Sequence, residues 1–393
     1  MSLATTLFGN LFAFIAIISV IVFIHEFGHF IVARLCKVKV EVFAIGFGKE
    51  LFGFCDRYQT RWKFCLLPFG GYVKMLGDAG EASNPNQELL DKMTAEEKSQ
   101  AFAFKNVYQR FAIVLAGPLF NFIAAIIILT FIFFLKGEAI TKPIVNRVVE
   151  NSPAAKSGII AGDIITEISG KKVKDFSEVR SYFAQYAKVS GKNKQESANQ
   201  KSKAETNSAE RQKNIAITLE RQQKTITVNI TPELTETSNL FDEKILMPTI
   251  GIISKEPEIV KLNIVQSFFR ANIETYNISI SIFKALKQLI TGERSVKELG
   301  GPIKIAKYSG KTFAIGWLMV LWFMAMISIN LGVMNLLPIP MLDGGHLFFY
   351  LVEMIFGKPI NPKTQALAFR IGFIILITLM IFTTANDIWQ ILG

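Results

Sequence analysis

Two histidines and a glutamate in the first apolar stretch form the pattern H-E-x-x-H, as His25, Glu26 and His29. Residues four positions apart lie on one face of a helix, so both imidazoles can hold one metal ion while Glu26 lies beside the open coordination position. Zinc suits such a site, because catalytic zinc needs three protein ligands, a free place for water, and a carboxylate that takes the proton of the water. The third ligand must come from elsewhere in the chain.

The alternative is a chance match, since short motifs have false positives. The chain has only three histidines, and two of them lie in this pentad. The pentad also lies in an apolar stretch, where ionisable side chains are costly and rare. These observations favour a metal site.

The composition indicates a membrane protein. Half of the 393 residues are hydrophobic, 34 of them are Phe, and the mean hydropathy is +0.34. A bilayer core of about 30 Å requires about 20 helical residues. Four apolar stretches reach or approach that length, and they cover 7–32, 111–135, 313–342 and 366–388. The N-terminus lacks a basic region and a cleavage site, so we expect a retained helix there.

The net charge of +11 could suggest a nucleic-acid partner, but the positions of the basic residues favour a membrane topology signal. Basic residues cluster in 34–110, directly after the first apolar stretch, and again in 358–370. The positive-inside rule places both segments in the cytoplasm, and therefore both termini and 136–312 outside. The odd number of cysteines, Cys36, Cys55 and Cys65, predicts reduced thiols and no disulfide framework.

Residues 38–76 alternate β-forming side chains with many glycines, which predicts a small β-sheet. Extended backbone next to a bilayer is tolerated where it is buried in protein or lines a wet cavity. A strand beside the metal could therefore add a substrate segment to its edge. An ordinary interfacial hairpin remains the alternative.

The external segment contains a strand at 144–149, a capped turn S-P-A-x-x-x-G-I at 152–159, and G-D-I-I-T-x-I-x-G at 162–170. An amphipathic helix at 176–186 and a hairpin at 215–230 follow. This order resembles a circularly permuted PDZ domain, which implies peptide binding between the strand at 144–149 and the helix. A plug or spacer is the alternative. The polar residues 188–213 predict a disordered insertion, and 258–288 predicts amphipathic helices along the membrane surface or against a helix bundle.

Asp343 is a carboxylate that follows some thirty uncharged residues, at the end of the third apolar stretch. His25 lies 18 residues after Leu7, about 27 Å along a helix, and Asp343 is expected at the same depth. Pro338 and Pro340 unwind the backbone before it.

Three motifs together resemble the site-2 protease family of intramembrane zinc metalloproteases, in its bacterial RseP-like branch. They are H-E-F-G-H at 25–29, G-P-x-x-N-F at 117–122 and N-x-x-P-x-P-x-L-D-G-G-H at 335–346. The resemblance implies zinc ligands at His25, His29 and Asp343, a general base at Glu26, and substrate-positioning roles for Asn335, Pro338 and Pro340. Asn121 is interpreted as a buried packing amide, and His346 as a structural or supporting residue.

The expected fold is therefore a multi-pass α-helical membrane protein with four transmembrane helices, a membrane-associated β-hairpin region and an inserted extracytoplasmic α+β PDZ-like domain. Some members of the branch have two tandem PDZ domains, whereas this chain shows one. The expected domains are a catalytic half (1–137), the PDZ-like domain (138–235), a linker with surface helices (236–312) and a C-terminal membrane half (313–393).

The resemblance implies cleavage of transmembrane segments of single-span proteins in regulated intramembrane proteolysis, for example of an anti-sigma factor or a signal-peptide remnant. It implies a bacterial inner-membrane location, lipid contact, peptide tails at the PDZ-like domain and no nucleic-acid partner. The alternative from another class is a catalytically silent membrane scaffold, which would have lost H-E-x-x-H. A metal transporter would carry ionisable residues spread through its helices, whereas those here lie at one depth.

Overall fold

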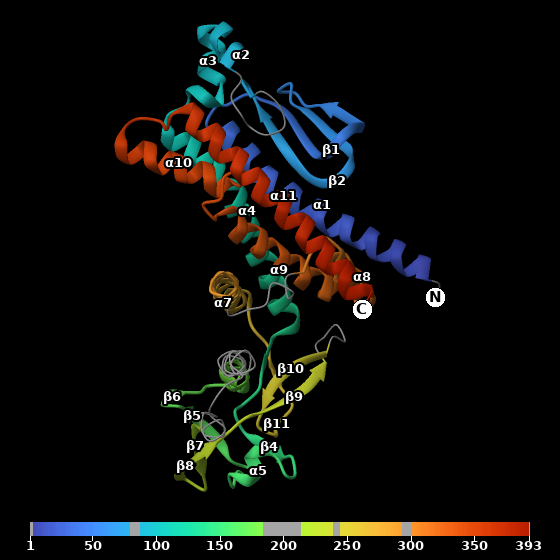
Figure 1. The fold of residues 1–393 in the computed structure, drawn as a ribbon, viewed down its shortest axis with the longest axis vertical. Helices are drawn as coiled ribbons and strands as arrows, with labels where there is room; N and C mark the ends of the chain where they lie inside the picture. The colour runs from blue at the N-terminus through green and yellow to red at the C-terminus, as the bar shows by residue number, and fades with distance from the viewer. Residues whose placement is uncertain (1–2, 79–86, 184–213, 239–243, 293–299, 393) are drawn as a thin grey trace, which may run out of the picture. The chain divides into compact units, whose positions relative to one another are not determined.

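The computed structural model describes residues 3–78, 87–183, 214–238, 244–292 and 300–392 (Figure 1). The chain forms two compact units. The first, which we call the membrane unit, comprises Met1–Leu135, Asn263–Lys287 and Ser295–Gly393. The second, the β-rich unit, comprises Lys136–Leu262 and Gln288–Arg294. The expected insertion at 188–213 lies outside the described residues.

Four helices of the membrane unit are long and apolar enough to cross a bilayer, as the composition predicts. They are α1 (Leu3–Leu35), α4 (Val107–Lys136), α9 (Trp317–Asn335) and α11 (Pro362–Leu392). Small residues let α1 and α4 approach closely. A Cβ atom built on Gly28 would lie 2.4 Å from the carbonyl oxygen of Ala116, so only glycine fits at this crossing.

The third apolar stretch, 313–342, is broken twice: at Gly316, which was not expected, and after Asn335, where the sequence predicted that Pro338 and Pro340 unwind the backbone. Gly316, with φ of 137°, separates α8 (Pro302–Ile315) from α9, and the backbone after Asn335 is irregular up to α10 (Asp343–Phe356). Pro338 and Pro340 cannot continue a helix, which explains the second break. The buried carboxylate of Asp387 accepts hydrogen bonds from the backbone N–H groups of Gly301 and Lys304 and thereby caps α8.

The predicted β region is an antiparallel pair, β1 (Val40–Cys55) and β2 (Arg61–Met75), which bends back on itself. Ile45 pairs with both Gly71 and Phe64, whereas Phe52 pairs with Phe64 alone. The segments therefore follow one another across the sheet in the order 50–55, 61–65, 40–45 and 71–75. Residues 71–75, here called the edge segment, lie at one border of the sheet.

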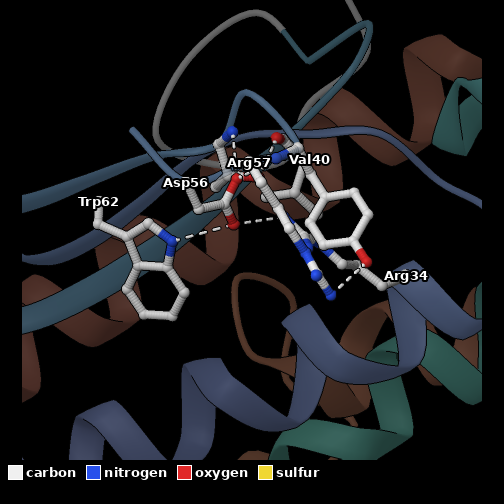
Figure 2. A network of polar contacts seen from close by, with 7 residues as sticks. Arg34, Val40, Asp56, Arg57 and Trp62 are labelled. Atoms are coloured by element: carbon white, nitrogen blue, oxygen red, sulfur yellow. Dashed lines mark hydrogen bonds and ion pairs between the residues drawn. The ribbon is translucent and has the colours of Figure 1, made fainter. Parts of the chain in front are cut away.

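A polar network fixes this sheet to the last turn of α1 (Figure 2). The Arg34 guanidinium donates to Asp56 Oδ2 and to Thr60 Oγ1, both at 2.7 Å, and Thr60 donates to the Val40 carbonyl at 2.8 Å. Trp62 Nε1 donates to the same Asp56 oxygen at 3.3 Å. These bonds hold the hairpin against the helix that carries both histidines.

The remaining helices of the membrane unit are α2 (Gln87–Lys92), α3 (Ala95–Gln100), the 3-10 turn η1 (Phe102–Phe104) and α7 (Ile264–Ile290), whose last residues belong to the β-rich unit. The helix α7 falls in the predicted amphipathic region. Its polar residues Ser267 and Thr275 are buried together with Ala271, so one face of this helix packs within the membrane unit.

The β-rich unit contains a four-stranded sheet in the order β6-β5-β7-β8, and three strand pairs, β11–β4, β12–β3 and β10–β9. Its core contains the fully buried side chains of Ile165, Ile217 and Leu219. Ser152 caps α5, as the S-P-A pattern predicts, and a helix covers 176–183. The bounds are β3 Glu138–Ile140, β4 Val145–Val148, α5 Pro153–Lys156, β5 Ile164–Ile168, β6 Lys171–Lys172, β7 Ile215–Arg221, β8 Lys224–Ile230, β9 Glu233–Ser238, β10 Lys244–Thr249, β11 Ile252–Ser254 and β12 Glu258–Val260.

Three strands, β10, β11 and β12, lie in the region for which the sequence predicted a linker. Strand β11 pairs with β4 and β12 pairs with β3, so each has a partner more than a hundred residues away. Such short strands are stabilised by distant partners, and local alternation does not reveal them. The expected domain boundaries themselves stay predictions.

Candidate metal centre

His25 and His29 lie on one face of α1, as the spacing predicts, and both are buried, with exposed fractions of 7% and 9%. Their Nε2 atoms are 3.3 Å apart, and the two rings are nearly perpendicular. The face of α1 that carries them lies against α4. A Cβ atom on Gly117 would lie 2.3 Å from His29 Nε2, so glycine at this position makes room for both rings.

Asp343 is the first residue of α10 and brings its carboxylate to the two histidines. Its Oδ2 atom lies 3.1 Å from His25 Nε2 and 3.5 Å from His29 Nε2. Two glycines after it lock α10 onto the preceding loop, because Cβ atoms on Gly344 and Gly345 would lie 2.1 Å and 2.6 Å from the carbonyl oxygens of Leu337 and Ile339. The three candidate ligands from two distant segments thus meet.

The arrangement fits a zinc ion. Zinc bonds to nitrogen or oxygen of about 2.0–2.1 Å at tetrahedral angles would put neighbouring ligand atoms about 3.3 Å apart. The three distances between the candidate ligand atoms are 3.1, 3.3 and 3.5 Å. Asp343 Oδ2 is buried and accepts no hydrogen bond within the described part of the chain. Burying such a carboxylate oxygen without a partner is costly, and a cation between these atoms would remove the cost.

The outer nitrogen of each imidazole also has a partner. His29 Nδ1 lies 2.9 Å from the carbonyl oxygen of Ile113, and His25 Nδ1 lies 3.0 Å from Nδ2 of Asn121. Metal-binding histidines commonly donate their outer N–H to an acceptor, which the Ile113 carbonyl provides for His29 and the side-chain amide of Asn121 can provide for His25. The Ile113 contact is not predictable from the sequence, because any residue type can supply a backbone carbonyl. The sequence indicated only a packing role for Asn121, whereas its side chain contacts His25.

A cavity of about 510 Å³ adjoins the three candidate ligands, and Glu26 lines it. The edge segment lies directly against Glu26, since a Cβ atom on Gly71 would lie 3.2 Å from Glu26 Cγ. The other walls come from the loop before α10, from α10 and from α11, through Leu342, Tyr350 and Phe373. The volume is within the usual range of ligand pockets.

The other predicted site residues take different positions. Asn335 lines the cavity, with Nδ2 3.4 Å from His25 Nε2. His346 also lines it and lies beside Phe369, with 4.7 Å between the ring centroids and a tilt of 36° between the ring planes. Pro338 and Pro340 are not among the residues described as lining the cavity. Pro340 instead packs against α11, where a Cβ atom on Gly372 would lie 2.2 Å from its carbonyl oxygen.

An ion pair at the far end of α10 fixes the helix that begins with Asp343. Arg110 donates to Glu353 at 2.6 Å and lies over the ring of Tyr350, at 5.0 Å from its centroid. Burial raises the pKa of Tyr350 to about 12, so its hydroxyl stays protonated. The sequence contains no local pattern for this contact, because its partners are 243 residues apart.

Comparisons with known proteins agree with this site. The model of "Peptidase family M50" matches residues 13–379. Two relatives are each named "Putative zinc metalloprotease". The one from Rickettsia conorii is 41% identical and covers 96% of this chain and 98% of its own, and the one from Agrobacterium fabrum is 36% identical and covers 98% and 97%. A relative named "Metalloprotease MmpA", from Caulobacter vibrioides, is 31% identical and covers 95% and 93%.

Two solved PDZ domains of SdrC-like proteins, from Listeria monocytogenes and Listeria innocua, are similar at 21% and 23% identity. The matches cover 28% and 31% of this chain and 84% and 100% of the PDZ domains. The TM-scores are 0.17 and 0.19, so the likeness does not establish a common fold. The family match extends over nearly the whole chain. This protein therefore belongs to peptidase family M50, the site-2 protease family, and is an integral membrane metalloprotease that depends on zinc.

Proposed function

We propose that the chain hydrolyses peptide bonds in transmembrane segments of single-span membrane proteins, with His25, His29 and Asp343 as zinc ligands and Glu26 as general base. The observation that carries the proposal is the convergence of two Nε2 atoms and one buried, unpartnered Oδ2 atom within 3.1–3.5 Å, beside Glu26. When bound, zinc would polarise the scissile carbonyl and lower the pKa of the attacking water.

Glu26 follows His25 directly in α1 and faces the cavity. Its carboxylate accepts the proton of the attacking water and then donates it to the amine that leaves. Asn335 lies on the same cavity, and its Nδ2 donates to the carbonyl oxygen of the substrate. Pro338 and Pro340 act indirectly, because they shape the loop that delivers Asp343.

The edge segment supports an extended substrate. Among the described strands, residues 71–75 pair with β1 and with no other strand, and Gly71, Tyr72 and Val73 line the cavity. A substrate that adds to this border as a further strand exposes its scissile bond near Glu26. A transmembrane helix hides its amides, so the substrate must first unwind, which favours substrates with helix-breaking residues near the cut.

The orientation follows from the basic residues. The chain is proposed to lie in a bacterial inner membrane. The positive-inside rule then puts 34–110 on the cytoplasmic side, and both termini and the β-rich unit on the periplasmic side. Cys55 is exposed on β1 and offers a direct test. A membrane-impermeant thiol reagent should label Cys55 only after the inner membrane has been opened. Equal labelling in spheroplasts would contradict this orientation.

The β-rich unit supports binding of peptide tails. Strand β4 is engaged along its length, with Val145 bonded to Gly162 and Asp163 and Val148 paired with Ile252. Strand β11 pairs with β4 alone among the described strands. We therefore propose the second border of β11, in place of the strand expected at 144–149, as the edge that receives a peptide.

A cleavage assay tests the proposed reaction. A tagged single-span substrate, such as an anti-sigma factor or a signal-peptide remnant, is co-expressed with the parent chain, with Glu26→Gln, or with Glu50→Gln as a matched control outside the cavity. Loss of the general base should slow cleavage about 10²- to 10⁴-fold, with bound zinc retained, whereas Glu50→Gln should cleave normally. Equal cleavage by Glu26→Gln would exclude this role.

The silent scaffold is disfavoured by the same geometry. A scaffold requires neither converging ligand atoms nor a cavity beside Glu26, and both are present. The family model that matches is that of a peptidase.

A further inference from the structure

A second cavity, of about 620 Å³, lies outside the candidate metal centre at the C-terminal end of α1, and we call it the basic pocket. Three segments that are far apart in the chain line it, namely 34–40, 58–60 and 99–105. Among the described residues that line it, none is acidic and four are cationic: Arg34, Lys37, Lys39 and Lys105. A cavity whose only charges are positive attracts an anion.

The charge of Arg34 is already balanced within the protein. Its guanidinium donates to Asp56 Oδ2 and to Thr60 Oγ1 (Figure 2). It also lies over the rings of Phe30 and Tyr58, at 4.6 and 4.3 Å from their centroids. Arg34 therefore forms a wall of the pocket and holds the hairpin in place, and its charge is not available to a ligand.

The three lysines are not balanced in this way. Lys37 and Lys39 are exposed and form no ion pair with the described part of the chain. Lys105 donates one N–H to the Ser99 carbonyl at 2.6 Å, which leaves the other N–H groups of its ammonium for a ligand. The carboxylate that acts on Lys39 is Glu97, which is bonded within its own capping box and does not line the pocket. The pocket therefore has an excess of positive charge.

Hydrogen bonds between the three segments fix the walls of the basic pocket. The Lys39 N–H donates to the Gln100 carbonyl at 3.0 Å, and the Thr60 hydroxyl donates to the Val40 carbonyl at 2.8 Å. Lys37 has a φ of 58°, the left-handed conformation that commonly ends a helix, so the chain turns sharply after α1. A site whose backbone is already in place loses little conformational entropy when a ligand binds.

The basic pocket lies where two membrane-spanning helices end. The candidate span of α1 ends at Leu35, and that of α4 begins at Val107. The two helices touch at Gly28 and Ala116, so these two ends lie at the same boundary of the membrane. Leu35 and Tyr108 are 75% and 69% exposed, as expected for side chains that contact lipid at this boundary. Lipid phosphates lie at this level, and basic pockets at the ends of membrane helices bind anionic headgroups.

We propose that the basic pocket binds the phosphate of one anionic phospholipid, with the ammonium groups of Lys37, Lys39 and Lys105 as its partners. The bound headgroup connects the end of α1 to the hairpin and to the segment before α4. The positive-inside rule also explains basic residues near helix ends, but it does not require them to converge on one cavity. Binding of this lipid requires only that α1 and α4 cross the membrane, and is independent of the proposed reaction.

Native mass spectrometry of the purified full-length chain in neutral detergent measures this binding. One phosphatidylglycerol should bind more tightly than phosphatidylcholine with the same acyl chains. The double variant Lys37→Gln/Lys39→Gln should weaken the binding of phosphatidylglycerol by about 10- to 30-fold. The matched control Lys358→Gln/Lys363→Gln removes the same charge at two exposed positions outside the pocket, and it should bind like the parent.

A second variant changes the charge of the pocket without removing a lysine. Gln59→Glu adds a carboxylate to the lining at almost unchanged shape and should weaken binding at least about tenfold. Thermal unfolding identifies variants that fail to fold. It should also show that phosphatidylglycerol stabilises the parent more than Lys37→Gln/Lys39→Gln.

Four results would overturn the proposal. The first is that Lys37→Gln/Lys39→Gln binds phosphatidylglycerol like the parent. The second is that both lysine pairs weaken binding equally, since net charge alone would then explain it. The third is that phosphatidylcholine binds as tightly as phosphatidylglycerol. The fourth is that sodium phosphate at the same concentration displaces the lipid, which would identify a site for a soluble anion.

Discussion

Two aspartates, one in each unit, show how differently this chain treats a buried carboxylate. Asp163 in the β-rich unit is fully buried, and both of its oxygens are bonded. Arg221 donates to Oδ1 and Oδ2 at 2.7 Å each, and the Ile160 N–H donates to Oδ2 at 3.0 Å. Asp343 in the membrane unit has a buried Oδ2 that accepts no hydrogen bond within the described residues and lies 3.1 and 3.5 Å from two imidazole nitrogens.

The difference separates a structural carboxylate from one that needs a further ligand. A guanidinium fork satisfies a carboxylate within the protein itself, and the result is a fixed contact. Burial alone would raise the pKa of Asp163, but the Arg221 guanidinium and the Ile160 N–H hold it below its usual range. Asp343 has no guanidinium beside it and instead faces two imidazole nitrogens, which are atoms that can share a metal ion with it.

The largest expected effect comes from Asp343→Asn. An amide is a poor zinc ligand, so bound zinc should be lost and cleavage should fall by at least about 10³-fold, as when a catalytic part is removed. Asp163→Asn is the matched control and should keep both zinc and cleavage in the fraction that is folded. Zinc content by elemental analysis and cleavage of a co-expressed substrate measure the two effects. Full zinc content in Asp343→Asn would remove the distinction between the aspartates.

Removal of the metal should destabilise the parent and leave Asp343→Asn unchanged. Free zinc at a thousand times its Kd stabilises the folded state by about 4 kcal/mol. Chelator should therefore lower the unfolding temperature of the parent, and added zinc should restore it. A fall of the same size in Asp343→Asn would show that zinc stabilises the protein at another site.

Asp163→Asn should reduce the stability of the β-rich unit by roughly 3 kcal/mol, because it leaves the Arg221 guanidinium without its anion. The depressed pKa of Asp163 fixes the sign of the pH dependence. The stabilisation is present above the pKa of the unfolded chain and is lost as the pH falls through the lower folded value. Denaturant unfolding of the full chain at pH 7 and pH 3 measures both. A loss that is the same at both pH values would contradict the ion-pair account.

Asp78 is an intermediate case and gives the smallest effect. Burial raises its pKa to about 7, although the carboxylate accepts the Met75 N–H at 3.0 Å. Because the folded pKa is raised, the stabilisation is full below the unfolded pKa and is lost as the pH rises through about 7. The free energy of unfolding of Asp78→Asn, measured relative to the parent, should therefore rise by roughly 2–3 kcal/mol from pH 5 to pH 8. If the stability difference between Asp78→Asn and the parent is the same at pH 5 and pH 8, the raised pKa of Asp78 is excluded.

Much of the fold was predictable from local pattern. The apolar stretches are continuous over the length of a bilayer, and the spacing of His25 and His29 fixes their common face. The alternation in 38–76 predicted the sheet, and the S-P-A pattern predicted the cap at Ser152. The break at Gly316 was not predicted, because a single glycine does not by itself end a helix. Strands β11 and β12 were not predicted, because their partners β4 and β3 lie more than a hundred residues away, and β10, which pairs with the neighbouring β9, was missed as well.

The sequence by itself determined which groups are available for chemistry: two imidazoles and a glutamate on one helix, and a carboxylate after a proline-containing loop. These are local properties, set by helical periodicity and by the absence of an N–H in proline. The tertiary structure alone decided how these groups face one another. The 3.1 Å approach of Asp343 to His25, the contact of the Asn121 side chain with His25 and the place of 71–75 beside Glu26 depend on helices and strands far apart in the chain. Packing and strand pairing between these elements select one arrangement.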